Sequence, residues 1–246
     1  MLARLTRAVR DAGGRGYKIA HADTSDARGI DVAFIYDPKV ARTKKSEWFQ
    51  HWVLKRYATR ELFQVNFTVD DKMLVVVGNH WPSRSAGQYE SEPFRIMAAE
   101  TLAYWVERIH EIQGDDVALV VLGDFNDEPF NRSVNEYARS TASRDQVLRS
   151  RSHHLLNLMA PLAGAGLGSL LYDGRWNMLD QILVSRGIVT GASGWKLAGD
   201  ATIEARELMA KPTSGAPRRF GLGSGKNVDL KGFSDHFPIG VKLVGG

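Results

Sequence analysis

Alternating and continuous hydrophobic positions predict a mixed α/β chain. Apolar residues alternate with polar ones at 63–69, which indicates a strand with one solvent-facing side. Asp70-Asp71 then turns the chain into an apolar strand at 73–77, so the two strands form a predicted hairpin. Residues 117–122 are continuously apolar, which is typical of a strand buried on both faces.

Helical spacing marks two further segments. Apolar residues recur every three or four positions between Leu2 and Ala12, and Gly13-Gly14 ends this predicted helix. The clearest helix spans residues 92–113 and is followed by Gly114. Its apolar stripe comprises Ala98, Leu102, Trp105, Val106, Ile109 and Ile112. The other predicted elements are strands at 17–20 and 30–36, a possible helix among glycine-rich loops at 131–175, and a loop-rich stretch at 185–232.

Composition limits the class of protein. A chain of 246 residues with 43% hydrophobic residues suits one α/β domain, and neither a repeat nor a linker divides residues 1–246. The absence of cysteine excludes disulfides and thiolate metal sites. No apolar stretch is long enough to span a bilayer, and Arg4, Arg7 and Arg10 interrupt any signal-peptide core. The sequence does not decide in which cellular compartment the protein acts.

The charge balance is mildly basic. The net charge is +4 and the pI is about 9.3, which suits a polyanionic partner such as nucleic acid. The alternative is an ordinary solvated basic surface. Basic residues are scattered, with small clusters at 44–45, 149–151 and 218–219, so the charge alone does not decide between the two.

Polar side chains gather where the predicted strands end. The motifs are, in chain order, Asn-His at 79–80, Gly-Asp-Phe-Asn at 123–126, Leu-Asp-Gln-Ile at 179–182 and Ser-Asp-His-Phe-Pro at 234–238. Active sites are commonly built at strand ends, because a sheet holds side chains from distant sequence positions in a fixed geometry. The four motifs are therefore candidates for one site.

In order and spacing, these motifs resemble the endonuclease/exonuclease/phosphatase family of DNase I-like, metal-dependent phosphoesterases. The resemblance covers residues 28–244. It implies an α/β sandwich of two sheets, mostly antiparallel or mixed, with flanking helices. The periodicity by itself supports a mixed α/β chain and no particular architecture. Since this fold carries several chemistries, the substrate is a separate question.

Phosphodiester hydrolysis gives these residue types a purpose. A catalyst must neutralise the phosphate charge, activate a water and protonate the leaving oxygen. A divalent cation suits the first task, while imidazoles and carboxylates suit the others. The chain offers aspartates but neither cysteine nor the closely spaced histidines of a zinc hydrolase, so Mg²⁺ or Mn²⁺ is the expected cofactor.

The resemblance implies a role for each catalytic candidate. Asp124 would orient or help deprotonate the attacking water. Asn126 would bind a phosphate oxygen or that water, and in an extended chain it projects to the same side as Asp124. His236 resembles the general base or phosphate-binding imidazole, and Asp180 the carboxylate that pairs with it. His80 resembles a second imidazole that binds phosphate or protonates the leaving oxygen.

The same residues have purely structural interpretations. The Gly-Asp-Phe-Asn segment consists largely of turn formers, and His80 could simply cap its strand. Asp180 could be solvated at a sheet edge, but an aspartate among apolar neighbours is costly when buried without a partner, so we expect it to have one. Five further histidines match no motif and are expected on the surface or in loops: His21, His51, His110, His153 and His154.

Four residues are candidates for binding substrate and one for binding metal. Asn79 is expected to support the imidazole that follows it. Arg84 could contact phosphate and Trp81 could stack on a base, although Trp81 could equally anchor its loop. Arg28 is a weaker phosphate-contact candidate. Asp235 resembles a residue that binds or supports the metal.

One part of the family pattern is missing. The family normally begins with a strand bearing an Asn and a strand ending in a metal-binding Glu, and residues 1–14 resemble the helix after that Glu. We therefore expect an N-terminally truncated chain with weak Mg²⁺ binding and reduced activity. The alternative is that another acidic residue substitutes, with Glu47, Glu61 and Glu90 available.

The expected function is a metal-dependent phosphodiesterase, foremost a nuclease acting on DNA or RNA. One alternative is a phosphatase or phospholipase-like enzyme of the same fold. Met178-Leu179-Asp180-Gln181 stands where inositol-phosphatase relatives have Trp-Cys-Asp-Arg, which argues against that branch. Another is a non-catalytic binding module that has lost its metal site, which the retained site residues oppose. The oligomeric state stays open.

Overall fold

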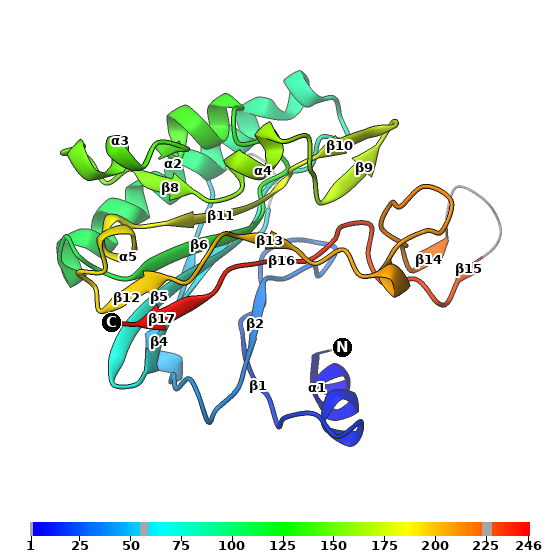
Figure 1. Ribbon diagram of the computed structural model, residues 1–246, viewed down its shortest axis with the longest axis horizontal. Helices are drawn as coiled ribbons and strands as arrows, with labels where there is room; N and C mark the ends of the chain where they lie inside the picture. The colour runs from blue at the N-terminus through cyan, green and yellow to red at the C-terminus, as the bar shows by residue number, and fades with distance from the viewer. Residues whose placement is uncertain (1, 55–58, 223–227) are drawn as a thin grey trace.

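The protein is described by a computed structural model covering residues 2–54, 59–222 and 228–246. Among these residues the largest sheet has seven strands, in the order β3-β4-β5-β6-β11-β8-β7 (Figure 1). The strands are β3 Trp48–His51, β4 Leu62–Val69, β5 Lys72–His80, β6 Leu119–Asp124, β7 Ser140–Thr141, β8 Leu155–Asn157 and β11 Asp180–Val184. The pairs β5–β6 and β7–β8 are parallel and the other pairs are antiparallel, so the sheet is mixed.

The predicted hairpin is confirmed. β4 and β5 pair in antiparallel register, and both Asp70 and Asp71 take positive φ values of 47° and 58°. Two successive left-handed residues match the twist of the flanking strands, and aspartate tolerates that conformation. The chain then crosses through helix α2, Gln88–Gln113, into the parallel strand β6.

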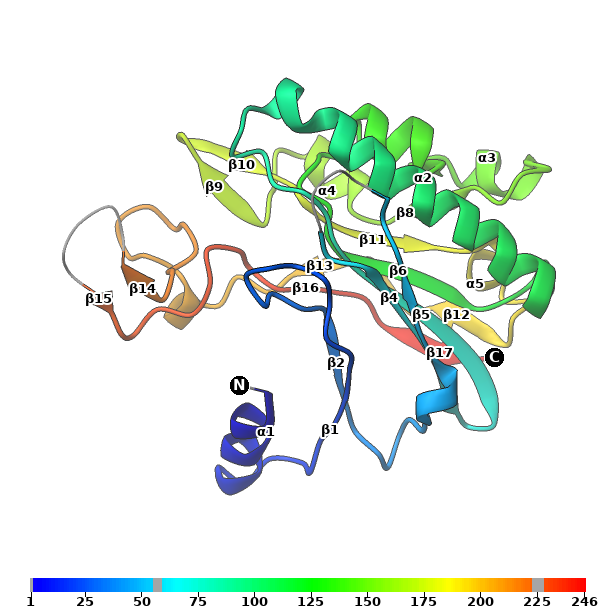
Figure 2. The same ribbon diagram turned by 180° about the vertical axis from the view of Figure 1, so that it is seen from behind.

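Helix α2 covers one face of the sheet (Figure 2). It begins four residues before the predicted start and ends as predicted. Its apolar stripe packs on buried valines and leucines of the central strands; the contributing helix residues are Ala98, Leu102, Val106 and Ile109. Ile112, near the end of the helix, is 72% exposed, so it was wrongly placed in the stripe.

The polar side of β4 was wrongly expected to face solvent. Gln64 and Asn66 are buried, because α2 covers this face. Gln64 bonds the ring of His51 at 2.8 Å and donates to Asn66 at 2.8 Å, while the His51 ring stacks on Trp105 of α2 at 4.0 Å. These bonds satisfy the buried amides. His51 is buried beneath Trp105, and His110 of α2 is buried as well. Both histidines were expected on the surface or in loops.

Short strand pairs cover the opposite face of the sheet and form the second layer of the sandwich (Figures 1 and 2). They are β1 Lys18–His21 with β2 Ala33–Tyr36, β12 Trp195–Leu197 with β17 Leu243–Gly245, and β13 Thr202–Ile203 with β16 Ile239–Gly240. Two apolar clusters join these pairs to the central strands; in one of them Phe34 of β2 stacks on Phe63 of β4. The layered α/β sandwich is thus confirmed.

The remaining elements lie around this sandwich. They are helices α1 Leu2–Asp11, α3 Arg144–Arg149, α4 Ala160–Gly164 and α5 Arg186–Thr190, single turns at Lys45–Glu47, Ser133–Tyr137 and Glu207–Met209, and the pairs β9 Leu170–Tyr172 with β10 Arg175–Asn177 and β14 Gly221–Leu222 with β15 Val228–Asp229. The predicted helix α1 is confirmed, but it projects from the sandwich and buries none of its residues (Figure 1). Within the described ranges, no helix has the length and apolar character needed to cross a membrane.

Gly123 offers a sharp test of how the central strands fit together. Its φ is 131°, and a Cβ atom there would lie 2.0 Å from the Asn79 backbone oxygen of β5. Gly114 has a similar φ of 94° but open space around it. We expect Gly114→Ala to cost roughly 1–3 kcal/mol through backbone strain. Gly123→Ala should cost more than about 4 kcal/mol because β5 and β6 must separate. Denaturant unfolding measures both, and equal losses would contradict the tight β5–β6 approach.

Candidate active site

The ends of three neighbouring strands bring the motif residues together. In the parallel β5–β6 pair His80 lies opposite Asp124, and in the antiparallel β6–β11 pair Asp124 lies opposite Asp180. These three side chains therefore stand in one row across the sheet. His236, three residues before the start of β16, contacts the Asp180 end of this row.

Asp180 and His236 are in close polar contact at one end of the row. The Nδ1 atom of His236 lies 2.6 Å from Asp180 Oδ2, and the Ser169 hydroxyl donates to the same oxygen at 2.5 Å. Burial disfavours the imidazolium, but the hydrogen bond to Asp180 and the nearby carboxylates outweigh it and raise the His236 pKa to about 9. His236 is therefore cationic at neutral pH. The expected partner of Asp180 is present.

Asp124 occupies the centre of the row. Its Oδ1 accepts the Asn126 backbone N–H at 2.8 Å, and its Oδ2 lies 3.7 Å from His80 Nε2. Burial, followed by the charge of Asp180, raises the Asp124 pKa to about 6. Two carboxylates so close together disfavour each other's ionisation, and a bound cation would relieve that repulsion.

Asn126 reaches the same place by a different backbone route from the one predicted. Its φ is 51°, so the chain after β6 turns sharply instead of continuing extended. The Asn126 side-chain amide nevertheless donates to Asp124 Oδ2 at 3.2 Å and to the Trp81 carbonyl at 3.0 Å. The shared placement of Asp124 and Asn126 therefore comes from this turn, because asparagine tolerates the left-handed conformation.

His80 differs from His236 in charge. Burial, followed by the positive charges of Arg60 and Arg28 and of His236, lowers the His80 pKa to about 4. The ring is one-third exposed and neutral at neutral pH. The site thus presents one neutral and one cationic imidazole on either side of a carboxylate pair.

Two of the predicted substrate contacts belong to the interior. Trp81 is 1% exposed, its rings lie 4.3 Å from Phe125, and its indole N–H donates to Asn79 Oδ1 at 3.0 Å. A buried indole cannot stack on a base, so the loop-anchor interpretation describes Trp81. Asn79 is also buried, and it supports Trp81 and the β5 backbone rather than the ring of His80.

The basic candidates differ in how they are held. The Arg84 guanidinium donates to the Asn126 carbonyl at 2.6 Å and to Asp127 at 2.8 Å, so it ties the loop after β6 together. The Arg28 side chain is 63% exposed and forms a two-pronged pair with Asp26. Arg28 therefore keeps a surface that a ligand can reach, whereas Arg84 is largely committed.

The acidic candidates for the metal are not gathered in one place. In the described part of the chain, the cluster at the row that could hold a cation consists of Asp124, Asp180 and His236. Asp235 is about half exposed and lies 3.8 Å from Arg219 instead. The glutamates considered as substitutes also lie outside that cluster: Glu47 accepts from Asn66, Glu61 from the Ser25 backbone, and Glu90 lies in the first turn of α2.

The sequence agrees with this architecture. The sequence profile described as Endonuclease/Exonuclease/phosphatase family matches residues 8–244, nearly the whole chain. The chain belongs to this family. No curated protein matches it by sequence. The family comprises hydrolytic phosphoesterases, so the chain belongs to a family of enzymes.

Solved structures of family proteins share the fold. A Bacteroides thetaiotaomicron family protein has a TM-score of 0.59 at 14% identity, covering 98% of this chain and 77% of that one. The mannosyl-6-phosphatase of the same organism has a TM-score of 0.57 at 15% identity, covering 98% and 82%. D. rerio TDP2 complexed with single-strand DNA product has a TM-score of 0.57 at 12% identity, with the same coverage. At these identities the likeness establishes the fold alone.

Sequence reasoning missed three residues around the row. Ser169 bonds Asp180, while Arg60 and Asp26 lie behind His80. Arg60 stands two residues before the strand β4, and a charge just ahead of an apolar strand was the available signal. Ser169 lies in a glycine-rich loop and gave no signal of its own.

The His236 titration tests the Asp180 contact. In metal-free protein, NMR should report a His236 pKa near 9, and Asp180→Asn should lower it because the charged partner is lost. A raised folded-state pKa stabilises the protein fully below the unfolded pKa of 6.5, and that stability is lost as pH rises through 9. The unfolding free energy should therefore fall between pH 6.5 and 9, and less steeply in Asp180→Asn. An unchanged His236 pKa in Asp180→Asn would contradict the contact.

Proposed function

We propose that this protein is a metal-dependent phosphodiesterase whose substrate is nucleic acid. The row of His80, Asp124 and Asp180, closed by His236, is the observation that supports this proposal. It combines a carboxylate pair for a cation with two imidazoles in different charge states. Phosphodiester hydrolysis needs charge neutralisation, a proton acceptor and a proton donor, and this row offers all three.

The donor set fits a hard divalent cation. Asp124 and Asp180 would hold Mg²⁺ or Mn²⁺ with several waters, since both ions favour carboxylate oxygens. Burial and, after it, the charge of Asp180 raise the pKa of Asp124, and a bound cation would stabilise its ionised form against both. When bound, the cation would neutralise the phosphate oxygens. Asp235 stays a second candidate ligand from the family pattern.

The chain's own residues would then divide the proton chemistry. Neutral His80, next to Asp124, can take a proton from the attacking water, and the Asp124 carboxylate would stabilise the resulting imidazolium. Cationic His236 can bind a phosphate oxygen or give its proton to the leaving oxygen. Asp180 orients the His236 ring by accepting a hydrogen bond from Nδ1, which leaves the Nε2 side of the ring for the substrate. Asn126 would complete the contacts to phosphate or water.

Nucleic acid is the substrate favoured by two observations. The net charge is +4, and the structure of TDP2 with single-strand DNA product has the same fold. The mannosyl-6-phosphatase of that fold favours a second candidate, a phosphatase acting on a sugar phosphate. A non-catalytic binding module is the third candidate, and the assembled row argues against it.

Hydrolysis assays separate these candidates. With Mg²⁺ or Mn²⁺ we expect cleavage of bis-nitrophenyl phosphate and of single-stranded oligonucleotides. We expect little release of inorganic phosphate from mannose 6-phosphate. Asp124→Asn and His236→Ala should each lower kcat/KM by about 10²–10⁴-fold. His154→Ala, which changes a histidine outside the row, serves as the control. Cleavage of the sugar phosphate but of neither diester would favour the phosphatase, and no hydrolysis of any substrate would favour the binding module.

Metal-dependent stabilisation tests the proposed ligands without any substrate. A cation that binds the folded protein alone raises the melting temperature with its concentration. Mg²⁺ should therefore stabilise the wild type, and this effect should be lost in Asp124→Asn and weakened in Asp180→Asn. Asp235→Asn is the informative comparison. If it abolishes the shift while Asp124→Asn does not, the metal lies at Asp235 and the proposed ligand set is wrong.

A further inference from the structure

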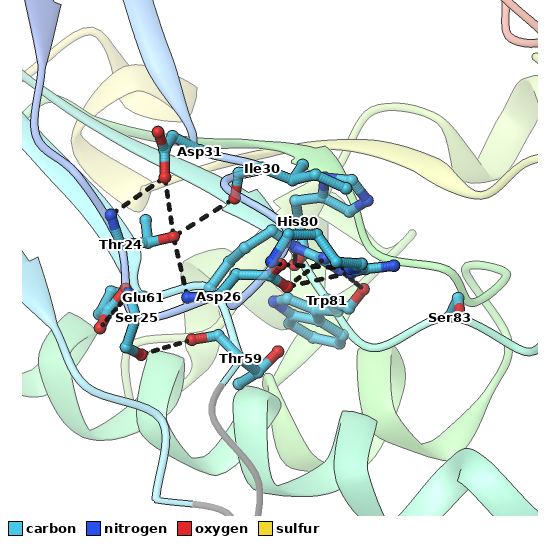
Figure 3. Close-up of polar contacts among 12 residues, drawn as sticks. Thr24, Ser25, Asp26, Ile30, Asp31, Thr59, Glu61, His80, Trp81 and Ser83 are labelled. Carbon is cyan, nitrogen blue, oxygen red and sulfur yellow. Dashed lines mark hydrogen bonds and ion pairs between the residues drawn. The ribbon is translucent and has the colours of Figure 1, made fainter.

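Arg60 is a buried arginine that directly contacts the backbone of the proposed catalytic segment. Its side chain is 2% exposed. Its Nε donates to the His80 carbonyl at 2.8 Å and its Nη2 to the Trp81 carbonyl at 2.8 Å, while Nη1 bonds Asp26 Oδ2 at 3.1 Å. Every nitrogen of the guanidinium thus has a partner. Figure 3 shows Asp26 beside the His80–Trp81 segment, between it and the loop that carries Asp31.

The Trp81 carbonyl connects Arg60 to the rest of the row. It accepts a second bond from the Asn126 side-chain amide at 3.0 Å. Asn126 in turn bonds both oxygens of Asp124 through its backbone and side chain. One carbonyl therefore links the end of β5 to the turn after β6. Displacing it would shift His80 relative to Asp124.

Asp26 extends the same network to Arg28. The Arg28 Nε and Nη2 atoms bond the two Asp26 oxygens at 3.1 and 3.0 Å, and the Arg28 backbone N–H bonds Oδ1 at 2.9 Å. These bonds from Arg28, with Arg60, lower the Asp26 pKa to about 2, so the carboxylate is ionised at all ordinary pH values. Asp26 thus holds an exposed guanidinium on one side and a buried one on the other.

Arg28 stands at the wall of a cavity next to the row. The cavity has a volume of about 270 Å³, and its lining includes Arg28, Thr59, Ser83 and Phe94. The lining also includes Arg60, Ser91 and the Asp26 carboxylate, which is paired with both arginines. Two guanidiniums, hydroxyls and an apolar wall suit a phosphate carried by an organic group. This composition matches one nucleotide next to the scissile bond better than a free anion.

We propose that Arg60 is a positioning residue that serves two parts of the site, holding His80 through the β5 backbone and holding Arg28 through Asp26. Arg28 then binds a substrate phosphate that neighbours the scissile one, in the cavity beside Ser83. This inference rests on the proposed phosphodiesterase function. Lysine cannot replace Arg60, because its ammonium group is a point charge and cannot span two carbonyls and a carboxylate in fixed directions.

The two arms of this network predict different kinetic effects. Arg60→Gln should lower kcat for bis-nitrophenyl phosphate by roughly 10–100-fold through misplacement of His80. Arg60→Lys should restore only part of that loss. Arg28→Gln should instead raise KM for oligonucleotides, with kcat for bis-nitrophenyl phosphate changed less than about twofold. Asp26→Asn should show both effects, because Asp26 contacts Arg60 as well as Arg28. Equal effects of Arg28→Gln on the small diester and on oligonucleotides would overturn the cavity assignment.

A double-mutant cycle tests whether Arg60 acts through His80. If it does, Arg60→Gln should have little further effect in a His80→Ala background, because the group that it positions is already gone. Arg95 offers a matched control: it is fully buried, and in the described part of the chain its hydrogen bonds go to Asp127, Ser91 and the Gln88 carbonyl instead of the His80 segment. Arg95→Gln should reduce stability comparably but combine additively with His80→Ala. Additive losses for Arg60→Gln would overturn the positioning role.

Hydrogen exchange provides a readout that does not need catalysis. In Asp26→Asn and Arg60→Lys, the amides of Trp81 and Asn126 should exchange faster while the Val75–Val77 core of β5 keeps its protection. If the wild type hydrolyses no diester, the proposed function fails, and this measurement still decides the role of Arg60. Unchanged protection at Trp81 and Asn126 in both variants, with the core intact, would overturn it.

Discussion

The register of β5, β6 and β11 is the constraint on which the site depends. Because β5 and β6 are parallel and β6 and β11 antiparallel, the pairing places His80 opposite Asp124 and Asp124 opposite Asp180. A slip of one residue in either pair would turn the affected side chain to the other face of the sheet. The buried cores on both faces oppose such a slip, since each strand inserts apolar residues into both. The packing of the sandwich therefore fixes how these side chains are placed relative to one another.

The row concentrates charge in a way that a purely structural site would avoid. Asp124 and Asp180 repel each other, and His236 offsets part of that repulsion at one end. The His80 ring stays neutral at the other end because it is partly buried and because Arg60 and Arg28 lie behind it. The site thus contains two imidazole rings, of which one is neutral and the other cationic. Their division of roles follows from their neighbours and not from their sequence motifs.

The sequence was informative where polar residues stand at the ends of apolar strands. Asp124, Asp180, His80 and His236 could be found because such residues interrupt an otherwise continuous pattern. Sequence was ambiguous for Trp81, because the same loop position suits a buried anchor or a stacking surface, and burial depends on partners such as Phe125 that lie far along the chain.

The sequence misled where apolar and polar residues alternate, because the polar face of such a strand can lie either in solvent or beneath another element. Gln64 and Asn66 alternate with apolar residues as on a wet face, but α2 covers them, and the chain satisfies their amides internally. The helix extends to Gln88 and the turn at Asn126 is left-handed, and neither boundary could be fixed by periodicity. Ser169 gave no signal in the sequence. Arg60 gave one, a charge before an apolar strand, but local sequence does not reveal which groups that charge contacts.

The charged groups behind the row are arginine–aspartate pairs that hold the segments next to it. Among the described residues, Arg60 pairs with Asp26 behind the end of β5, while Arg95 and Arg84 pair with Asp127 just after Asn126. Buried ion pairs add little net stability, because desolvation offsets most of their attraction, but removing one partner is strongly destabilising. Their value here is directional: a guanidinium with fixed donors holds carbonyls and carboxylates at defined angles. A site that must keep a carboxylate pair and two imidazoles in register gains from such supports on both sides, even at a cost in stability.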